Sequence, residues 1–520
     1  MELKISYFII LLIILYLLIN KKNIKNIINI NNFGSIETFV NIKKKNYLFK
    51  NQYLIVKKNI NHNNKILINT KKILFDDFHI YKGDLLEDCN YKNQYNKILI
   101  LGFIIDPYNY KLNNLSIAKN ICNSNNLEEV FEKIQKLSGR FVIYLNLNGN
   151  KIILNDCCSL KKIYYMNKNN TIFSSSEKIL RLVLNKDLNI SKDKKEYINS
   201  VKFKKSEFKW YDNSGYTDNT KILLPNTYYD LNKNNYKRIP FFLPKKDNLE
   251  NISKKISKII KNSIICLLHR EKELILPITA GSDSRVLLAC CKNFINKINF
   301  YIFSNNNLKT GNKVDTIVSN FYAKKYNLNF KNVEINDDKL DDNFKHIFVN
   351  NYIIPRILPK TKNIEYHLYN NQNKININGN CAEVLKENFN NIKKIINLED
   401  FKKQIRENNN IEYINNSLEK YFYNNNKIAN KYNIDICNIY HWELQQGLWG
   451  GLFPHEQDIS IEEFSPFNNR ELLLLGLSLD KKYRNKKNSY LLFDNIINQE
   501  WSNLMEIKFN PKISEIENIL

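Results

Sequence analysis

The sequence is short of the residues that bend a chain sharply. Only 13 of its 520 residues are Gly and 10 are Pro, so a tight turn of small residues is an exception that needs a reason. The nine cysteines include no C-x-x-C pair, which argues against a zinc site. Their odd number and the length of the chain argue against disulfides, so we expect reduced thiols in a reducing compartment.

The composition that is present indicates a large globular protein. Hydrophobic residues make up 43% and charged residues 25%, and the length predicts two or three domains. The net charge of +26 would suit a nucleic-acid partner. The lysines, however, are spread along the whole chain instead of forming one basic block. We therefore do not expect nucleic acid as a partner.

An apolar run occupies residues 5–19 within the segment 1–24. It is shorter than the ~20 residues that a spanning helix prefers, and no small-residue cleavage site follows it, which argues against a cleaved signal peptide. A membrane anchor is favoured over a helix buried in the core, because no polar residue marks one face of the run. Lysines are more frequent after the run than before it, which predicts cytoplasmic catalytic domains.

Residues 30–242 form the first predicted domain. Between 45 and 170, short β-branched or aromatic runs such as KILILGFII (97–105) alternate with Asn, Gly or Asp turns, a pattern typical of strands. LEEVFEKIQKLSG (127–139) has one apolar helical face and is predicted to end at Gly139. We expect a layered α+β domain.

Predicted strands and helices alternate in the second domain, residues 247–520. The strands lie at 273–278, 298–306 and 329–335, and the helices lie at 250–269, 285–294 and 315–328. This alternation of apolar strands with helices predicts a doubly wound parallel sheet in an α/β fold. Ligands of such sheets bind beyond the carboxyl ends of the strands. Further on, a helix over 441–451 is expected to bury Trp442 and Trp449 on one face.

A tight turn, TAGSDS (279–284), directly follows the first of these strands. Ala280 and Gly281 let the backbone bend and approach a ligand closely. The N–H groups of the turn and of the next helix would converge on an anion. Asp283 would be repelled by a phosphate alone, so its presence predicts Mg²⁺. No G-K-S/T follows, which excludes a Walker loop. The alternative is a plain helix N-cap formed by Asp283 and Ser284.

TAGSDS resembles the S-G-G-x-D-S pyrophosphate loop of the ATP-pyrophosphatase (PP-loop) superfamily. The resemblance implies that the loop binds ATP through Thr279, Ala280, Gly281, Ser282, Asp283, Ser284 and Arg285. It also implies nucleotide contacts from Ser304 and Asn305. NGNCAE (378–383) resembles the second pyrophosphate and metal element, with Gly379 in its turn and Glu383 as a second Mg²⁺ ligand beside Asp283.

Two further stretches resemble the asparagine synthetase family. IEEFSPFNN (461–469) is similar to its E-x-R-x-P-F-x-D motif, after which the family places a catalytic lysine. Lys486 and Lys487 are the candidates here, with ordinary surface lysines as the alternative. Asp315 corresponds to an acidic residue ahead of a helix, where it could equally be an N-cap.

The first domain resembles the amino-terminal, Ntn-hydrolase-type glutaminase domain of asparagine synthetases. The similarity lies in LGFIIDP (101–107) and in the stretch 138–165. In that family a cysteine at the mature amino terminus attacks glutamine. This sequence begins with Met, and its first cysteine is Cys89. We therefore expect a glutaminase-like fold without glutaminase activity.

The resemblance implies an ATP-dependent amide-forming ligase of asparagine synthetase type. Such an enzyme joins AMP to a carboxylate, aspartate or an analogue, releases pyrophosphate, and lets ammonia or an amine attack the acyl-adenylate. ATP and Mg²⁺ would be its cofactors, with Asp283, Glu383, Lys486 and Lys487 as catalytic residues. One alternative is a catalytically degenerate nucleotide-binding or scaffold protein at a membrane. Another is a PP-loop enzyme that acts on RNA.

Overall fold

A computed structural model describes most of the chain after residue 48. The described residues are 49–58, 67, 70–166, 171–184, 189–304, 310–335, 339–358, 360–389, 395–407, 409–486 and 490–516. The apolar run at 5–19 lies outside these residues. Within them, no helix combines the length and apolar character needed to cross a bilayer.

The first half of the chain forms two six-stranded antiparallel sheets. The first sheet has the order β10-β8-β9-β1-β3-β2 and contains β1 (Tyr53–Lys57), β2 (Lys71–Phe75), β3 (Phe78–Lys82), β8 (Tyr164–Met166), β9 (Ile172–Ser174) and β10 (Thr220–Ile222). The second has the order β12-β11-β7-β6-β5-β4 and contains β4 (Asp88–Lys92), β5 (Lys97–Ile105), β6 (Ser138–Leu147), β7 (Asn150–Asn155), β11 (Thr227–Asp230) and β12 (Asn235–Arg238).

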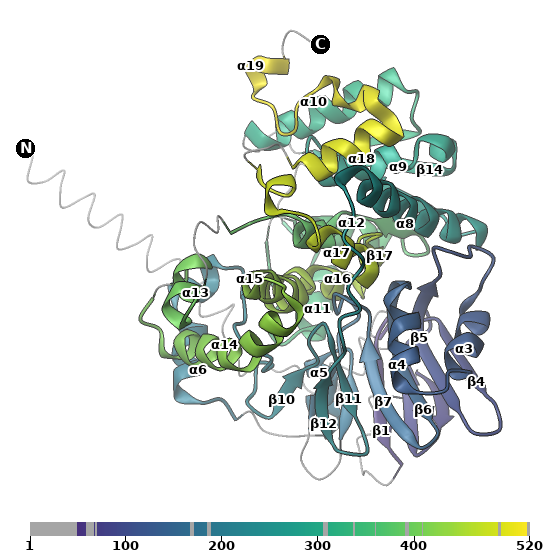
Figure 1. Ribbon diagram of the computed structural model, residues 1–520, viewed down its shortest axis with the longest axis vertical. Helices are drawn as coiled ribbons and strands as arrows, with labels where there is room; N and C mark the ends of the chain where they lie inside the picture. The colour runs from purple at the N-terminus through teal and green to yellow at the C-terminus, as the bar shows by residue number, and fades with distance from the viewer. Residues whose placement is uncertain are drawn as a thin grey trace, which may run out of the picture.

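The alternation of side chains along β5 explains how the layers form. Leu99 and Leu101 pack in the cluster between the two sheets. Ile98 and Ile100, one position out of phase, pack in a second cluster with helices α3 (Asn114–Cys122) and α4 (Leu127–Gln135), which lie beside this sheet in Figure 1. Both faces of the strand are thus buried, and a helical layer covers the sheet.

Gly139 does not end the preceding helix as the sequence predicts. Helix α4 stops at Gln135, and Gly139 lies inside β6 with φ of 132°. A Cβ at Gly139 would lie 2.4 Å from the carbonyl oxygen of Phe103, and one at Gly102 (φ 96°) would lie 2.2 Å from that of Arg140. The two glycines therefore permit a close approach of β5 and β6 that no other residue allows.

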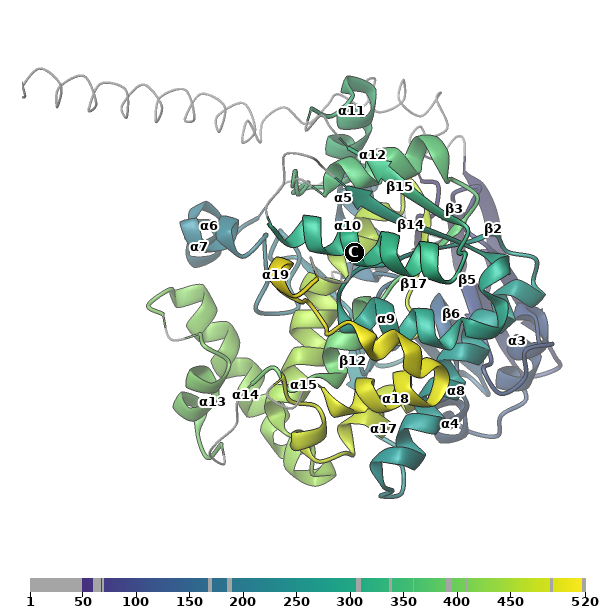
Figure 2. The same ribbon diagram turned by 90° about the horizontal axis from the view of Figure 1, so that it is seen from above.

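The second half contains a five-stranded sheet in which every pairing is parallel. Its order is β15-β14-β13-β16-β17, formed by β13 (Leu274–Pro277), β14 (Ile298–Ser304), β15 (Phe330–Glu334), β16 (Ile375–Ile377) and β17 (Glu462–Phe464). The helices next to it in Figures 1 and 2 include α8 (Leu249–His269), α9 (Ser282–Cys290), α10 (Thr310–Lys325), α17 (Arg470–Leu477) and α18 (Leu491–Trp501). The predicted α/β class is confirmed at this level, with antiparallel sheets and one parallel sheet.

Further helices fill the space around the sheets. They are α5 (Glu177–Leu184), α6 (Lys192–Asn199), α7 (Val201–Lys205), α11 (Asp342–Asn351), α12 (Thr361–Asn370), α13 (Leu398–Gln404), α14 (Glu412–Tyr432), α15 (Ile436–Tyr440), α16 (Leu452–Gln457) and α19 (Ile513–Ile516). Leu54 and Val56 of β1 share a hydrophobic cluster with Ile347 and Phe348 of α11. Elements from both halves of the chain thus cover the first sheet.

The two tryptophans expected on one buried face separate in the structure. Trp442 is buried and its Nε1 donates to the carbonyl oxygen of Cys157 at 2.9 Å, whereas Trp449 is 39% exposed. The segment His441–Gly450 is a π-helix. Because its hydrogen bonds run from i to i+5, seven residues no longer return to the same face. The prediction was wrong for Trp449 for this reason.

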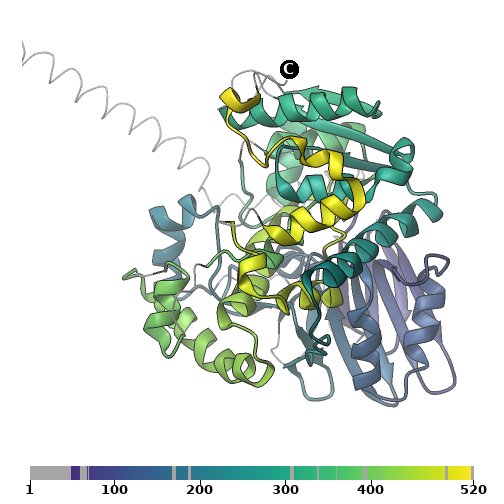
Figure 3. The ribbon, with the colours of Figure 1, turned by 45° about the horizontal axis from the view of Figure 1, so that its top comes forward.

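Buried charges join the antiparallel sandwich to the parallel sheet. Arg140 of β6 is fully buried; its Nη2 lies 2.8 Å from Asp458 Oδ1 and its Nη1 lies 2.9 Å from Glu462 Oε1. Lys161 Nζ also reaches Asp458, at 3.1 Å. Asn468 Nδ2 donates to the carbonyl oxygen of Gly139 at 2.8 Å. Helix α8 runs along the same boundary in Figure 3. These contacts hold the antiparallel sandwich against the parallel sheet, which carries the predicted site.

Candidate functional site

The strand order of the parallel sheet reverses between β13 and β16. Strands β14 and β15 extend from one side of β13, and β16 and β17 from the other. In sheets of this kind, ligands bind beyond the carboxyl ends of the two central strands, at the point where the strand order reverses. Both predicted loops, TAGSDS after β13 and NGNCAE after β16, leave the sheet at this point.

Gly379 brings the two loops into direct contact. A Cβ at this position would lie 2.6 Å from Asp283 Cβ, closer than two such atoms can approach. The absence of a side chain thus lets the turn after β16 lie against the first turn of α9. Two motifs that are about a hundred residues apart in the sequence form one site.

Internal hydrogen bonds hold the first loop in shape. The Thr279 hydroxyl lies 2.8 Å from the Ser284 hydroxyl, and the Gly281 N–H donates to Thr279 Oγ1 at 3.2 Å. Asp315 of α10 accepts a hydrogen bond from the Ala280 N–H at 2.8 Å. These hydrogen bonds are therefore mainly internal to the site: they connect Thr279, Ala280, Gly281 and Asp315 with one another and with Ser284.

The amino terminus of α9 lies open beside this loop. Gly281 is its N-cap and has no side chain to cap it, and the helix begins at Ser282. Asp283 is therefore inside the first turn and does not cap the helix, contrary to the plain N-cap alternative. In the described part of the chain, no hydrogen bond is found for the N–H groups of Ser282, Asp283 and Ser284. Such a terminus favours an anion.

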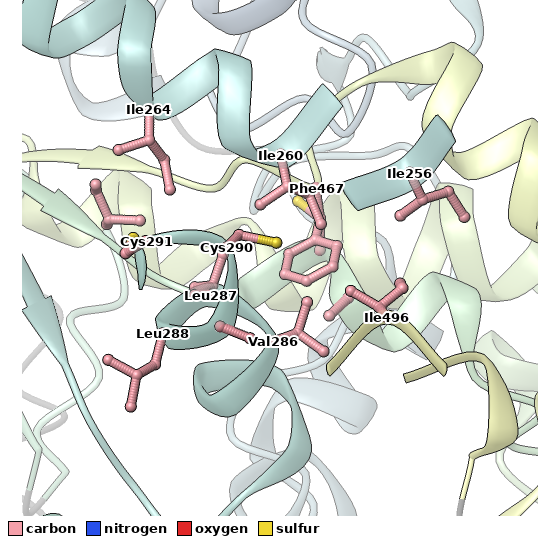
Figure 4. Close-up of a cluster of buried hydrophobic side chains, with 14 of the residues drawn as sticks. Ile256, Ile260, Ile264, Val286, Leu287, Leu288, Cys290, Cys291, Phe467 and Ile496 are labelled. Atoms are coloured by element: carbon pink, nitrogen blue, oxygen red, sulfur yellow. The ribbon is translucent and has the colours of Figure 1, made fainter. Parts of the chain in front are cut away.

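Hydrophobic packing fixes the direction of α9. Val286, Leu287 and Cys290 belong to a buried cluster with Ile260 of α8 and Ile496 of α18. Figure 4 shows these side chains between the three helices. Since the helix is held on both sides, packing fixes the position of its first turn at the carboxyl end of β13.

Arg285 connects the first loop to the end of the chain. One of its nitrogens, Nη2, donates to the carbonyl oxygen of Ala280 at 3.0 Å, and Nη1 donates to that of Ile507. The guanidinium also lies 4.7 Å from the centre of the Phe509 ring, and the Asn510 N–H donates to the Ala280 carbonyl oxygen at 3.0 Å. Arg285, which the sequence predicted to contact the nucleotide, thus holds the first loop against the segment around Ile507 and Phe509.

Lys386, which the sequence analysis missed, lies between the two predicted metal ligands. Its Nζ is 2.8 Å from Asp283 Oδ1 and 2.5 Å from Glu383 Oε1. Its side chain is only 8% exposed. Burial lowers the pKa of Lys386, but the carboxylates of Asp283 and Glu383 outweigh this effect and raise the pKa above its usual value. The lysine is therefore charged at neutral pH.

The same contacts set the charge state of Asp283. Burial raises the pKa of its carboxyl group, Lys386 lowers it and Glu383 raises it, with a net increase above the usual value. Glu383 lies three residues before Lys386 in a short 3₁₀ turn, Asn380–Leu385. The spacing of Glu383 and Lys386 was the signal available in the sequence, but it is common in a lysine-rich chain.

The carboxylate pair does not fit a resident divalent metal ion. Among the described residues, no cluster of three or more His, Cys, Asp or Glu side chains is placed to hold one. The space between Asp283 and Glu383 is taken by the Lys386 ammonium. The prediction that the two carboxylates lie together agrees with their placement, but their shared partner is a lysine.

The other predicted site residues in the described part of the chain lie outside the contact between the two loops. Ser304 ends β14, and its hydroxyl donates to Asn332 Oδ1 at 2.6 Å. Lys486 is exposed; the preceding Asn485 forms a parallel bridge with Glu387, so this segment runs beside the second loop. Asn305 and Lys487 lie outside the described residues.

A cavity of 480 Å³ opens beside the second loop. Asn380 and Glu383 line one wall, and His441 and Trp449 line another. Burial lowers the pKa of His441 to about 4, so its imidazole is neutral at pH 7. The remaining wall comes from residues near position 209, far from the loops in the sequence, which is why the cavity could not be predicted. Its volume suits a small molecule.

Charged groups at the far wall of the cavity are paired. Glu407 Oε1 lies 3.0 Å from Lys209 Nζ and accepts a hydrogen bond from the Tyr211 hydroxyl at 2.6 Å; its Oε2 lies 2.9 Å from Lys202 Nζ. Two ammonium groups therefore share one carboxylate. This wall carries an excess of one positive charge.

All nine cysteines have a raised pKa. They are Cys89, Cys122, Cys157, Cys158, Cys266, Cys290, Cys291, Cys381 and Cys437. In every case burial is the main cause. A nucleophilic cysteine requires a lowered pKa, because the thiolate is the reactive form. No cysteine of this chain has that environment in the structure.

Comparison with known proteins gives weak likenesses. No family model and no curated protein matches the chain. Among solved structures, it is similar to the glutamine-dependent NAD⁺ synthetase from Acinetobacter baumannii in complex with ADP, with 14% identity and a TM-score of 0.15 over 23% of this chain and 22% of that chain.

Two more likenesses cover more of the chain. One is to an allosteric regulatory enzyme of purine biosynthesis (9% identity, TM-score 0.24, 53% of this chain and 64% of that chain). The other is to glutamine phosphoribosylpyrophosphate amidotransferase from B. subtilis complexed with ADP and GMP (9%, 0.23, 52% and 64%). The chain thus spans less than two thirds of each of these proteins, and TM-scores this low support no argument about activity.

Proposed function

We propose that the chain binds ATP at the reversal point of the parallel sheet and uses it to activate a carboxylate for amide formation. The contact between Gly379 and Asp283 carries this proposal, because it joins two phosphate-type loops into one site. The α9 terminus supplies free N–H groups, and Lys386 supplies a positive charge beside them. Backbone N–H groups with an ammonium are the groups that bind a polyphosphate.

The chemistry follows from the poor leaving ability of a carboxylate oxygen. One carboxylate oxygen attacks the α-phosphorus of ATP, and the bond from that phosphorus to the β-phosphate bridge breaks. Pyrophosphate leaves with charge that the α9 terminus and Lys386 stabilise. A nitrogen nucleophile then attacks the acyl carbon of the adenylate and AMP leaves, while the nitrogen loses its extra proton to solvent. The products are an amide, AMP and pyrophosphate.

The cavity next to the second loop is the proposed binding site of the acid. It lies beside Glu383, one side chain away from Lys386. Lys202 and Lys209, which share Glu407, would attract an anionic substrate to the far wall of the cavity, opposite Glu383. Aspartate or an analogue of similar size is the proposed carboxylate.

Free ammonia or an amine is the proposed nitrogen donor. In the asparagine synthetase family, ammonia is released from glutamine by an activated cysteine. The pKa of every cysteine in this chain is raised, so none is activated in that way. The antiparallel sandwich then contributes structure to the synthetase half through Arg140 and its partners. We propose this role for the glutaminase-like domain.

Pyrophosphate release by the full chain tests the proposal. The protein would be supplied with ATP, aspartate and ammonium, and then with glutamine in place of ammonium. We expect release with ammonium, none with glutamine, and loss of release in Asp283→Asn. Asp342→Asn is the matched control, because Asp342 also lies in the first turn of a helix, α11, but is exposed. Absence of ATP binding to the wild type would refute the proposal.

A catalytically degenerate nucleotide-binding protein is the second candidate. The Ala280 N–H already donates to Asp315, and Arg285 already donates to the carbonyl oxygens of Ile507 and Ala280. Fewer hydrogen-bond donors of the first loop therefore remain for a reacting nucleotide. This candidate predicts ATP binding that depends on Asp283 without pyrophosphate release from any small carboxylate tested.

A further inference from the structure

The position of Lys386 is tightly defined. Its ammonium contacts both oxygens of Asp283, at 2.8 Å (Oδ1) and 3.0 Å (Oδ2), and lies 2.5 Å from Glu383 Oε1. The rings of Tyr490 and Phe493 lie on another side, with their centres 5.2 and 5.7 Å from Nζ. With the side chain 8% exposed, Lys386 is held in place by these contacts, unlike the many lysines on the surface.

The charges make a cation necessary at this point. Asp283 and Glu383 come from different loops and converge on one small space, so two unneutralised carboxylates there would repel each other. The Lys386 ammonium neutralises one of the two charges and is covalently attached to the second loop. A divalent ion that entered between the carboxylates would have to displace this ammonium from its buried ion pairs, which is costly.

The donors of the ammonium are suited to a phosphate ligand. An ammonium has three N–H donors and no acceptor. If one N–H is shared between the two oxygens of Asp283 and another is directed at Glu383, the third is available to a ligand that enters between the α9 terminus and the second loop. Phosphate oxygens are acceptors, and they would meet Lys386 and the N–H groups of Ser282 and Ser284 together.

We propose that Lys386 is the resident cation of this site and replaces a divalent metal ion between Asp283 and Glu383. The proposal rests on the proposed function in that the ligand is the polyphosphate of ATP. It adds that ATP binds here without a metal ion bridging the two carboxylates. It also assigns Lys386 as a phosphate-binding residue, whereas the family resemblance offered Lys486 and Lys487 as candidates for a catalytic lysine.

Metal binding without nucleotide tests the replacement directly. Mn²⁺ would be titrated into the full chain and followed by electron paramagnetic resonance. We expect Lys386→Met to bind one more Mn²⁺ per chain than the wild type, because the carboxylate pair is then free. Lys402→Met is the matched control, since Lys402 pairs with Glu399 at the same spacing in α13, away from the loops. Equal Mn²⁺ binding by wild type and Lys386→Met would overturn the proposal.

ATP affinity with and without Mg²⁺ tests the second part. For the wild type, we expect dissociation constants by calorimetry in Mg²⁺ and in EDTA to agree within about threefold. For Lys386→Met, we expect ATP binding at least about tenfold weaker in EDTA than in Mg²⁺. Lys386→Arg keeps the charge and should behave as the wild type. A tenfold loss for the wild type in EDTA would overturn the proposal.

The two assays separate the failure of this proposal from the failure of the proposed function. If the wild type binds no ATP in either buffer, the proposed function fails. The Mn²⁺ titrations of the wild type and Lys386→Met still test, in that case, whether Lys386 excludes a metal ion. A melting temperature of Lys386→Met near that of the wild type confirms that the variant is folded.

Discussion

A buried carboxyl group below the second loop gives the most direct test of the site. Glu463 of β17 has no exposed surface. Its Oε1 accepts from Asn376 Nδ2 at 2.9 Å, and its Oε2 accepts from Asn378 Nδ2. Burial raises the pKa of Glu463 to about 7, although both asparagines and Arg140 lower it. This carboxyl group therefore titrates near neutral pH in the folded protein.

The sign of the effect follows from proton binding. The usual pKa of a glutamate is 4.5, so between pH 4.5 and 7 the folded state holds a proton that the unfolded state has lost. Stability from this group is therefore greatest at low pH and falls as the pH rises through 7. At about 1.4 kcal/mol per pH unit, the loss between pH 5 and pH 8 is about 2.5 kcal/mol.

Glu463→Gln removes the titration and keeps the shape. The melting temperature of the wild type minus that of the variant should decrease from pH 5 to pH 8. At about 2 °C per kcal/mol for a unit of this size, the decrease is about 5 °C. Melting followed by calorimetry or circular dichroism measures it. Glu419→Gln on the exposed face of α14 controls for the loss of one carboxylate. A difference that stays constant within about 1 °C across this range would refute the reasoning.

Three other predictions concern close contacts. Gly379→Ala would push its Cβ against Asp283 and should weaken ATP binding at least about tenfold in calorimetry. Gly139→Ala should lower the melting temperature strongly, because both φ and the Phe103 carbonyl oxygen oppose a side chain. Asp458→Asn removes the buried carboxylate that Arg140 and Lys161 share, leaves Arg140 with Glu462 alone, and should cost about 3–5 kcal/mol at pH 7. Burial would raise the pKa of Asp458, but Arg140 lowers it well below 3.8, so this cost should shrink below pH 3.8.

Local signals in the sequence were sufficient for the elements around the first loop. Apolar runs followed by small residues predicted β13 and its turn, and the periodicity of 250–269 predicted α8. Asp283 and Glu383 were predicted to lie together, and they do. Periodicity and turn chemistry act over a few residues, so they are readable in one sequence.

Features that depend on tertiary packing could not be read this way. Lys386 is one lysine in a lysine-rich chain, and only the meeting of two loops gives it two carboxylate partners. The role of Arg285 depends on Ile507, more than two hundred residues away. The exposure of Trp449 depends on a π-helix, for which a single sequence offers no reliable pattern.

The burial of Arg140 has a consequence for how the protein folds. Its partners Asp458 and Glu462 are more than three hundred residues further along the chain. While the protein is being synthesised, Arg140 of β6 therefore lacks both acidic partners for most of that time. Contacts of such long sequence separation slow folding, and an incomplete hydrophobic unit is prone to aggregation. We expect the sandwich to stay loosely packed, and open to chaperones and proteases, until the segment around Asp458 leaves the ribosome.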